Sequence, residues 1–245
     1  LPFQTAPTPR RKVPAMPKIV ILTGAGISAE SGLGTFRDEG GLWAQHRIED
    51  VATPEGFARD PQLVVDFYNT RRAQAAEAIP NAGHTALAQL EAAMPGDVLV
   101  VTQNVDGLHE KAGSTNVLHM HGQLDSALCA ACDHRWTAPL QMAVGTLCPA
   151  CNRPAARPDI VWFGEIPYYM EEIEMRLSEA DIFAAIGTSG NVSPAAGFVQ
   201  AAAAYGALTV ELNLEPSLVV SQFDETHFGP ASETVPKWVD KLLNA

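Results

Sequence analysis

Short apolar segments recur along the chain and alternate with longer amphipathic stretches. Largely apolar segments at 18–23, 97–102 and 181–186 are typical of strands buried on both faces of a parallel sheet. Three further strands are expected at 117–120, 159–163 and 208–212. No apolar run reaches the ~18–20 residues that a membrane-spanning helix needs. The pattern therefore predicts an α/β fold, a Rossmann-like doubly wound parallel sheet.

The stretches between these runs follow a 3.6-residue period. They predict helices over 61–78, 84–94, 171–179, 194–205 and 232–243. Pro61 suits a first helical turn, and Ser232 is the expected N-cap of the closing helix. Strands that alternate with helices in this way are typical of a doubly wound parallel sheet.

Composition and charge narrow the class of protein. The chain has 245 residues, 47% of them hydrophobic and 18% charged, as in a globular protein. Its net charge of −12 argues against nucleic acid as a partner and suits a cationic one, such as a lysine-rich peptide. We expect no membrane partner. We expect a cytoplasmic protein, with an organelle presequence as the alternative that the basic residues at 10–12 leave open.

Four cysteines fall into two pairs. Cys129-x-x-Cys132 and Cys148-x-x-Cys151 are separated by fifteen residues, a spacing typical of a tetrahedral zinc site. Four thiolates leave no open position, so the expected zinc ion is structural. Two disulfides or a redox C-x-x-C are the alternatives; the first suits a small secreted protein, and neither pair follows a βα turn of the redox type.

The segment with the cysteines lacks a long period and is expected to form an inserted module. We assign residues 1–17 to a flexible N-terminal arm, and 18–37, 95–121 and 158–245 to the Rossmann-like domain. Residues 38–94 and 122–157 would form a smaller domain, made of a helical module and the zinc module.

The first strand runs directly into a glycine-rich turn. Gly24 and Gly26 follow Thr23, and small residues continue to Gly34. Glycines let a backbone turn tightly and let a pyrophosphate approach the amides. The spacing only half fits the G-x-G-x-x-G dinucleotide pattern, so a turn without a ligand is the alternative.

Polar residues follow the strand at 97–102. Gln103, Asn104, Asp106 and His109 lie where ligands bind in an open parallel sheet, beyond the carboxyl ends of the strands. His121 follows the next short strand and is a candidate general base near pH 7. His119 is a weaker candidate for that role.

Taken in order, these motifs resemble the sirtuins, a family of NAD-dependent protein-lysine deacylases. The motifs that carry the resemblance are Gly24-Ala25-Gly26-Ile27-Ser28, Thr35-Phe36-Arg37, the segment 102–109, His121-Gly122, the cysteine pairs, Val161-Trp162-Phe163-Gly164-Glu165, Gly187-Thr188-Ser189 and Asn213. They cover about residues 18–243. The chain is most similar to the class III members, which include bacterial deacylases and the mitochondrial desuccinylase type.

The resemblance implies that the Rossmann-like domain binds NAD as a consumed co-substrate. The implied NAD-binding residues are Gly24, Ala25, Gly26, Ile27, Ser28, Phe36, Arg37, Trp43, Gln103, Asn104, Asp106, Gly187, Thr188, Ser189, Asn213, Leu214, Glu215 and Ala231. Asn104 and Asp106 would contact the nicotinamide end, and Phe36 would shield the reaction from water. His121 would accept a proton from the ribose hydroxyls. The implied products are nicotinamide, deacylated lysine and 2′-O-acyl-ADP-ribose.

The resemblance also implies a site for acylated lysine side chains of proteins. Val161, Trp162, Phe163, Gly164 and Glu165 would form an extended segment that pairs with the substrate backbone.

A Tyr-x-x-Arg pair marks class III sirtuins, and here it is Tyr68 and Arg71, which share one face of the helix at 61–78. A tyrosine hydroxyl beside a guanidinium can receive a carboxylate. Ala52 matches the small residue that widens the class III acyl pocket, so we expect removal of succinyl and malonyl groups as well as acetyl. Arg72 is expected on the surface.

Three other functions remain open. A hydride-transferring dehydrogenase would need a full G-x-G-x-x-G and would leave the zinc module unexplained. A sirtuin-like protein ADP-ribosyltransferase would transfer ADP-ribose to a protein instead of forming acyl-ADP-ribose. A non-catalytic acyl-lysine binding module would not need His121, Asn104 and Asp106 together. We expect the protein to act as a monomer.

Overall fold

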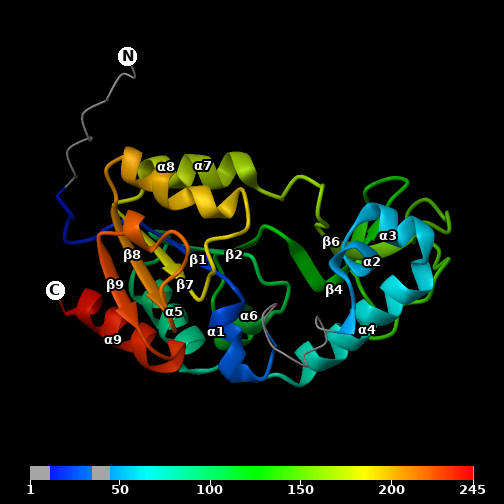
Figure 1. The fold of residues 1–245 in the computed structure, drawn as a ribbon, viewed down its shortest axis with the longest axis horizontal. Coiled ribbons are helices and arrows are strands. Elements are labelled where there is room, and N and C mark those ends of the chain that lie inside the picture. Colours follow the sequence, from blue (N-terminus) through cyan, green and yellow to red (C-terminus); the bar gives the residue numbers. More distant parts are fainter. Residues whose placement is uncertain (1–11, 35–44, 245) are drawn as a thin grey trace, which may run out of the picture.

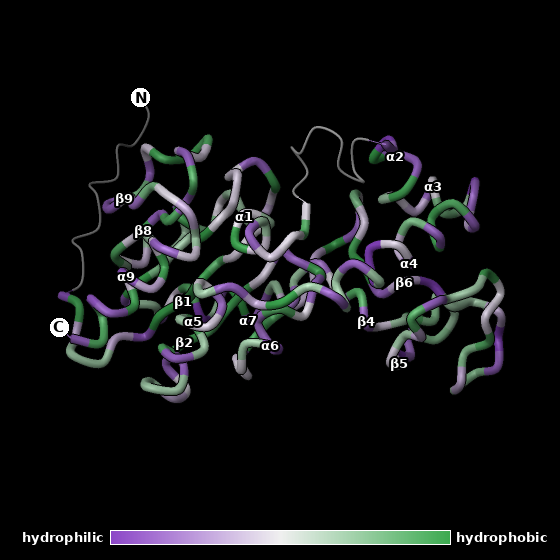
Figure 2. The backbone as a smooth tube through the Cα atoms, turned by 90° about the horizontal axis from the view of Figure 1, so that it is seen from below, coloured by the Kyte–Doolittle hydropathy of each residue, from purple (hydrophilic) through white to green (hydrophobic). Residues whose placement is uncertain are grey.

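The computed structural model describes residues 12–34 and 45–244. They form a larger lobe built on a six-stranded sheet and a smaller lobe built on helices and a three-stranded sheet (Figure 1). Figure 2 shows the two lobes from a second direction, with β1 and β2 in one and β4, β5 and α4 in the other. Within the described residues no helix is long and apolar enough to span a bilayer.

The main sheet is parallel throughout. Its strands, in spatial order, are β3 (Val117–His119), β2 (Val98–Thr102), β1 (Ile19–Thr23), β7 (Ile182–Ile186), β8 (Leu208–Asn213) and β9 (Glu225–Phe228). The chain builds outward from β1 on one side and then returns to build β7, β8 and β9 on the other. This order places a topological switch point between β1 and β7, which is where an open parallel sheet opens a ligand crevice.

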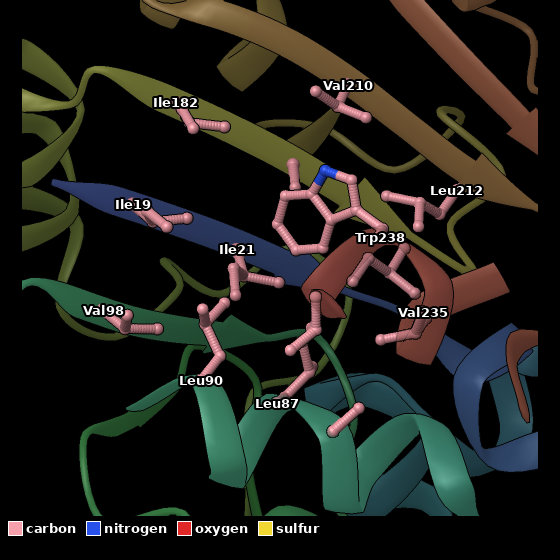
Figure 3. Close-up of a cluster of buried hydrophobic side chains, with 14 of the residues drawn as sticks. Ile19, Ile21, Leu87, Leu90, Val98, Ile182, Val210, Leu212, Val235 and Trp238 are labelled. Atoms are coloured by element: carbon pink, nitrogen blue, oxygen red, sulfur yellow. The ribbon is translucent and has the colours of Figure 1, made fainter. Parts of the chain in front are cut away.

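Helices cover both faces of this sheet (Figure 1). One face packs against α5 (Ala82–Ala93) and α9 (Ala231–Leu243), and the other against α7 (Met170–Glu179) and α8 (Phe198–Ala204). Alternate residues of β1 supply the two cores, because successive strand side chains point to opposite faces. Figure 3 shows Ile19 and Ile21 of β1 facing Leu87 of α5 and Trp238 of α9.

The smaller lobe combines two parts of the chain. Its helices are α2 (Ile48–Val51), α3 (Pro54–Arg59) and α4 (Pro61–Glu77), and its antiparallel sheet has the order β5 (Arg135–Thr137), β4 (Gly122–Cys129) and β6 (Ala156–Ile160). A buried cluster that includes Phe67 and Tyr68 of α4, Leu124 of β4 and Ile160 of β6 joins the helices to the sheet. Two short helices, α1 (Ala25–Ser28) and α6 (Leu108–Ala112), follow β1 and β2.

The strands expected at 18–23, 97–102, 117–120, 181–186 and 208–212 are confirmed within two residues, and so are the helices expected at 61–78, 84–94, 171–179 and 232–243. The helix expected at 194–205 begins later, because a 3₁₀ turn at Ala195–Gly197 precedes α8. Together they confirm the Rossmann-like doubly wound parallel sheet. The division into domains at the stated bounds stays a prediction.

Two local predictions are wrong. The strand expected at 159–163 ends at Ile160 and pairs with β4 in the small sheet instead of continuing the main one. Ser232 does not cap α9, because that helix begins at Ala231, after Pro230. The amide and hydroxyl of Ser232 instead donate to the carboxylate of Glu30.

Candidate active site

A crevice of about 1340 Å³ lies beyond the carboxyl ends of β1, β2, β7 and β8, and its walls include residues of the small lobe. Most of the expected site residues line it together: Gly24, Ala25, Gly26, Ala52, Tyr68, Arg71, Gln103, Asn104, Asp106, His121, Val161, Trp162, Phe163, Gly164, Glu165, Gly187, Thr188, Ser189, Asn213, Leu214, Glu215 and Ala231. Ile27 and Ser28 are buried and do not line it. Phe36, Arg37 and Trp43 lie outside the described residues.

The glycine-rich turn brings β1 against β7. The amide of Gly26 donates to the carbonyl of Gly187 at 2.8 Å, and Gly187 itself has a φ of +62°. A Cβ on Gly26 would lie 2.7 Å from the Cα of Gly187, closer than any real side chain could sit. These positions need glycine because two backbones touch there, and the contact holds the turn at the rim of the crevice.

Ser28 connects Asn104 and Asp106 beneath the crevice. Its hydroxyl donates to Asp106 at 3.1 Å and accepts from the side-chain amide of Asn104 at 3.1 Å. The Asn104 amide also donates to the carbonyl of Gly24 at 3.1 Å. Burial raises the pKa of Asp106, although the amide of Leu108 and the Ser28 hydroxyl donate to it and oppose the shift. Ser28 is therefore a support for Asn104 and Asp106, not a lining residue.

His121 is held in the tautomer that a base requires. Its Nδ1 lies 3.2 Å from the carbonyl of Gln103, which can only accept, so Nδ1 carries the proton and Nε2 is left unprotonated. Burial lowers the pKa of His121, although the Gln103 hydrogen bond opposes the shift. The ring is therefore neutral at pH 7, with one basic nitrogen at the wall of the crevice.

The opposite end of the crevice is built from β7 and β8. Asn213 donates to the carbonyl of Thr188 at 2.8 Å, and Gln103 donates to the Thr188 hydroxyl at 3.0 Å. These bonds tie three strand ends together. Ser193, Ser217 and Pro230 also line this end and were missed, because they follow no strand in the predicted pattern.

Tyr68 and Arg71 share one face of α4, as their spacing predicts. The Arg71 guanidinium carbon lies 5.9 Å from the centre of the Tyr68 ring. Burial raises the pKa of Tyr68 to about 12, although Arg71 opposes the shift. Burial lowers the pKa of Arg71, opposed by Tyr68 and Asp106. A guanidinium keeps its charge under such a shift, so the crevice contains a partly buried cation beside a neutral phenol.

Trp162 connects Tyr68 of α4 to the segment that follows β6. Its indole N–H donates to the Tyr68 hydroxyl at 3.1 Å, which leaves the Tyr68 proton available to another acceptor. The Arg157 guanidinium stacks on the Trp162 ring at 3.6 Å and pairs with both oxygens of Glu165, at 2.7 and 2.9 Å. The sequence analysis found neither Arg157 nor its contacts with Trp162 and Glu165.

We expect an extended segment at 161–165, but in the structure it is only partly extended. Glu165 donates its amide to the carbonyl of Trp162, and Gly164 between them has a φ of +93°, so the chain makes a tight turn. The carboxylate of Glu165 also accepts from the Trp162 amide and so closes the turn. The amide of Phe163 donates to the carbonyl of Ala52 at 2.9 Å, which joins this turn to α2.

Arg72 was expected on the surface and is instead buried. Its guanidinium donates to the carbonyl of Leu124 in β4 and to the side chain of Asn69. The prediction is wrong because α4 packs on both sides: one face borders the crevice and the next faces the small sheet. Arg72 thus supplies donors to carbonyls that the contact between helix and sheet removes from water.

The four cysteines form the expected cluster. The sulfur atoms of Cys129, Cys132, Cys148 and Cys151 lie within 4.8 Å of one another and all four thiols are free. Such a set of sulfurs fits a tetrahedral Zn²⁺ ion, whose ligands would come from the end of β4 and from two turns. Disulfides within or between the pairs are absent from this cluster.

Two buried histidines behind the site give a testable dependence of stability on pH. Burial lowers the pKa of His84 to about 4 and, with the neighbouring His84 and His119, that of His109 to about 3. The unfolded chain binds protons near pH 6.5 while the folded chain does not. The free energy of unfolding should therefore fall as pH falls below 6.5, by up to about 1.4 kcal/mol per pH unit for each histidine.

Urea unfolding at several pH values between neutral and mildly acidic checks this. The His84→Gln variant should show a flatter decline of the unfolding free energy than the unmodified protein, since one of the two groups no longer titrates. Replacement of the exposed His134 by Gln is the control and should leave the slope unchanged. Equal slopes in the His84→Gln variant and the unmodified protein would contradict the prediction.

Comparison with known proteins agrees with this geometry. A model of the Sir2 family matches residues 24–194. An NAD-dependent protein deacylase of Caulobacter vibrioides is 56% identical over 230 residues, which cover 92% of this chain and 97% of the relative. An NAD-dependent protein deacylase of Escherichia coli (strain K12) is 57% identical over 232 residues, which cover 93% and 82%.

Solved structures share the fold. A complex of a Sir2 homologue with NAD superposes with a TM-score of 0.85 at 36% identity, covering 94% of this chain and 91% of that one. Sir2Af2 bound to a myristoylated histone peptide gives 0.72 at 31% identity, covering 94% and 93%. Because the family model matches more than half of its length, the chain belongs to the Sir2 family.

Proposed function

We propose that this protein is an NAD-dependent protein-lysine deacylase that removes succinyl and malonyl groups as well as acetyl groups. One observation carries the proposal: a neutral histidine with a basic Nε2 and a buried Tyr-Arg pair line the same crevice at the switch point of the sheet. The relatives named NAD-dependent protein deacylase support the activity, and the Sir2 homologue bound to NAD supports the co-substrate.

The crevice has room and chemistry for both substrates. NAD would lie along the ends of β1, β7 and β8, with its pyrophosphate at Gly24–Ser28 and its adenosine near Thr188 and Asn213. Asn104 and Asp106 would bind the nicotinamide end, where Ser28 holds both side chains. His121 Nε2 would accept the proton of a ribose hydroxyl. The products would be nicotinamide, deacylated lysine and 2′-O-acyl-ADP-ribose.

The acyl end of the crevice supports the preference for acidic acyl groups. Arg71 supplies a cation where water is partly excluded, and Tyr68 supplies a hydroxyl proton beside it. A terminal carboxylate of a succinyl group could accept from both, and charge-assisted hydrogen bonds of this kind are stronger than neutral ones. Ala52 leaves space in the same wall.

The remaining features suit a bacterial-type enzyme of the cytoplasm that acts as a monomer. The four free thiols suit a structural zinc ion in a reducing compartment. The strand ends of the larger lobe and the Tyr68–Arg71 pair of the smaller lobe, both of which line the crevice, come from the same chain.

The Arg71→Met variant tests the carboxylate-receptor role. We expect kcat/KM for a succinyl-lysine peptide to fall about 10- to 100-fold, since a charged hydrogen bond contributes ~1.5–3 kcal/mol. The value for the matching acetyl-lysine peptide should change by less than about threefold. Steady-state assays of both peptides measure this.

The control for the Arg71 variant is Arg59→Met, which removes an exposed arginine of the same lobe that does not line the crevice. It should leave both peptides unaffected. An equal loss for succinyl- and acetyl-lysine in Arg71→Met would contradict the proposed role of Arg71, while leaving NAD-dependent deacylation itself intact.

A further inference from the structure

His119 has two hydrogen-bond acceptors, one at each ring nitrogen. It ends β3 and its side chain is 5% exposed. Its Nδ1 lies 3.1 Å from the backbone carbonyl of Asn104, and its Nε2 lies 2.8 Å from a carboxylate oxygen of Glu110 in α6. The weaker candidate for the catalytic base is therefore fully occupied by contacts inside the protein.

The number of protons on His119 follows from these two contacts. A backbone carbonyl can only accept a hydrogen bond, so Nδ1 must carry a proton. An ionised carboxylate can also only accept, so Nε2 must carry one as well. A neutral imidazole has one proton and would leave one contact as two facing lone pairs. We infer that His119 is a buried imidazolium and that it is a positioning residue, which fixes the backbone of Asn104 for binding the nicotinamide end of NAD.

The charges around His119 agree with this. Burial alone would lower the pKa of His119, but the hydrogen bond and charge of Glu110, with the Asn104 carbonyl and Asp106, raise it above its ordinary value. Burial would likewise raise the pKa of Glu110, but His119 holds it below its ordinary value. The other titratable neighbour is His109 of α6, which stays neutral. Two carboxylates thus face one cation.

Asn104 depends on this contact for its position. Its amide donates to the Thr102 hydroxyl at 3.0 Å, and its side-chain amide donates to Gly24 and Ser28. His119 holds the remaining backbone group, the carbonyl. Within the described part of the chain, these bonds leave the side-chain oxygen of Asn104 without a hydrogen bond, in a residue that lines the crevice.

The neighbouring carbonyl serves the catalytic base. Gln103 accepts from His121, and Asn104 accepts from His119. Two histidines two residues apart therefore contact successive carbonyls of one segment. Among the described residues, His121 contacts one acceptor, the Gln103 carbonyl, and stays neutral, whereas His119 has a second acceptor in Glu110 and is charged.

The sign of the pH dependence follows. The pKa of His119 is raised in the folded protein. The stability that its charge contributes is therefore complete at pH values below the ordinary histidine pKa, and it is lost as pH rises through the raised pKa. With Glu110 still ionised, the neutral ring would keep its one remaining proton on Nε2, so the bond from Nδ1 to the Asn104 carbonyl would be lost. The affinity for NAD should therefore decline as pH rises through the raised pKa of His119, and kcat should change less than this affinity.

Glu110→Gln tests this without touching the site. A glutamine amide can accept from a protonated Nε2 or donate to an unprotonated one, and the substitution removes the charge that keeps both protons on the ring. Imidazole ¹⁵N NMR of the unmodified protein should show two protonated nitrogens for His119 at neutral pH. In the variant, His119 should titrate at lower pH, and the roughly fivefold alkaline rise of KM for NAD that we expect of the unmodified protein should be lost, because the neutral ring then keeps its proton on Nδ1 and its bond to Asn104. Glu171→Gln on the exposed face of α7 is the control and should change neither.

A neutral-imidazole signature for His119 at neutral pH would overturn the inference. So would an alkaline rise of KM for NAD that is the same in Glu110→Gln and in the unmodified protein. The inference rests on the proposed use of NAD, yet the two fail separately. If no acyl peptide is turned over with NAD, the proposed function fails, and NMR together with calorimetric binding of NAD across pH still decides the role of His119.

Discussion

Replacement of His121 by alanine is expected to lower kcat for a succinyl-lysine peptide by about 10²–10⁴-fold, the contribution of a well-placed general base. The expectation follows from its tautomer: Gln103 fixes the proton on Nδ1, and burial lowers the pKa of His121 and keeps Nε2 free of a proton at pH 7. The melting temperature should change little, because His121 is only partly buried and lines a crevice. Steady-state kinetics and thermal unfolding measure the two effects.

The His121 variant also separates two steps of the proposed reaction. Release of nicotinamide does not need the proton acceptor, so exchange of labelled nicotinamide into NAD should survive when deacylation does not. Replacement of His227 by alanine is the control, since that histidine lies on β9 and does not line the crevice. A His121→Ala variant that retained kcat within a few-fold of the unmodified enzyme would show that another group accepts the proton.

Removal of zinc is expected to abolish activity through the fold rather than through the chemistry. The cysteine cluster closes the end of the small sheet, and the same sheet begins beside the site: Gly122 follows His121, and the amide of Val161 donates to the His121 carbonyl at 2.9 Å. Loss of the metal would loosen β4 and β6 together, and with them the position of His121. Structural zinc sites stabilise their modules by many kcal/mol.

The Cys148→Ser variant should bind less than the equimolar zinc expected for the unmodified protein. Its melting temperature should fall by about 10 °C or more, since each kcal/mol lost lowers it by ~2–4 °C in a domain of this size. Elemental analysis and thermal unfolding measure this, and Thr146→Ser in the same loop is the control. Full activity in a protein shown to be free of zinc would contradict the structural role.

The parts of the fold that the sequence predicts best are those that local pattern determines. The buried strands β1, β2 and β7 are nearly continuous apolar runs, and sequential strands of such runs lie in a parallel sheet. β9 was missed because its sequence, Glu-Thr-His-Phe, is polar and it lies at an edge, where one side of the ladder faces solvent. β6 was assigned to the wrong sheet because a run of extended residues does not specify its partner strand.

The candidate site divides in the same way. Residues at strand ends and the Tyr68–Arg71 pair follow from position along the chain, because a strand end and a helical spacing are local properties. The roles of Arg72, Arg157 and His119 do not follow from position along the chain. Their roles depend on which distant carbonyl, ring or carboxylate the fold brings against them: Leu124 for Arg72, Trp162 for Arg157 and Glu110 for His119. Such partners become visible only once the sheets are packed.

The measurement that tests the central claim most directly is mass spectrometry of the products from a succinyl-lysine peptide, with and without NAD. We expect equal amounts of deacylated peptide, nicotinamide and 2′-O-succinyl-ADP-ribose, and no reaction when NAD is omitted. Transfer of ADP-ribose to the peptide, or loss of the succinyl group without NAD, would contradict the claim that this crevice joins an acyl-lysine to the ribose of NAD.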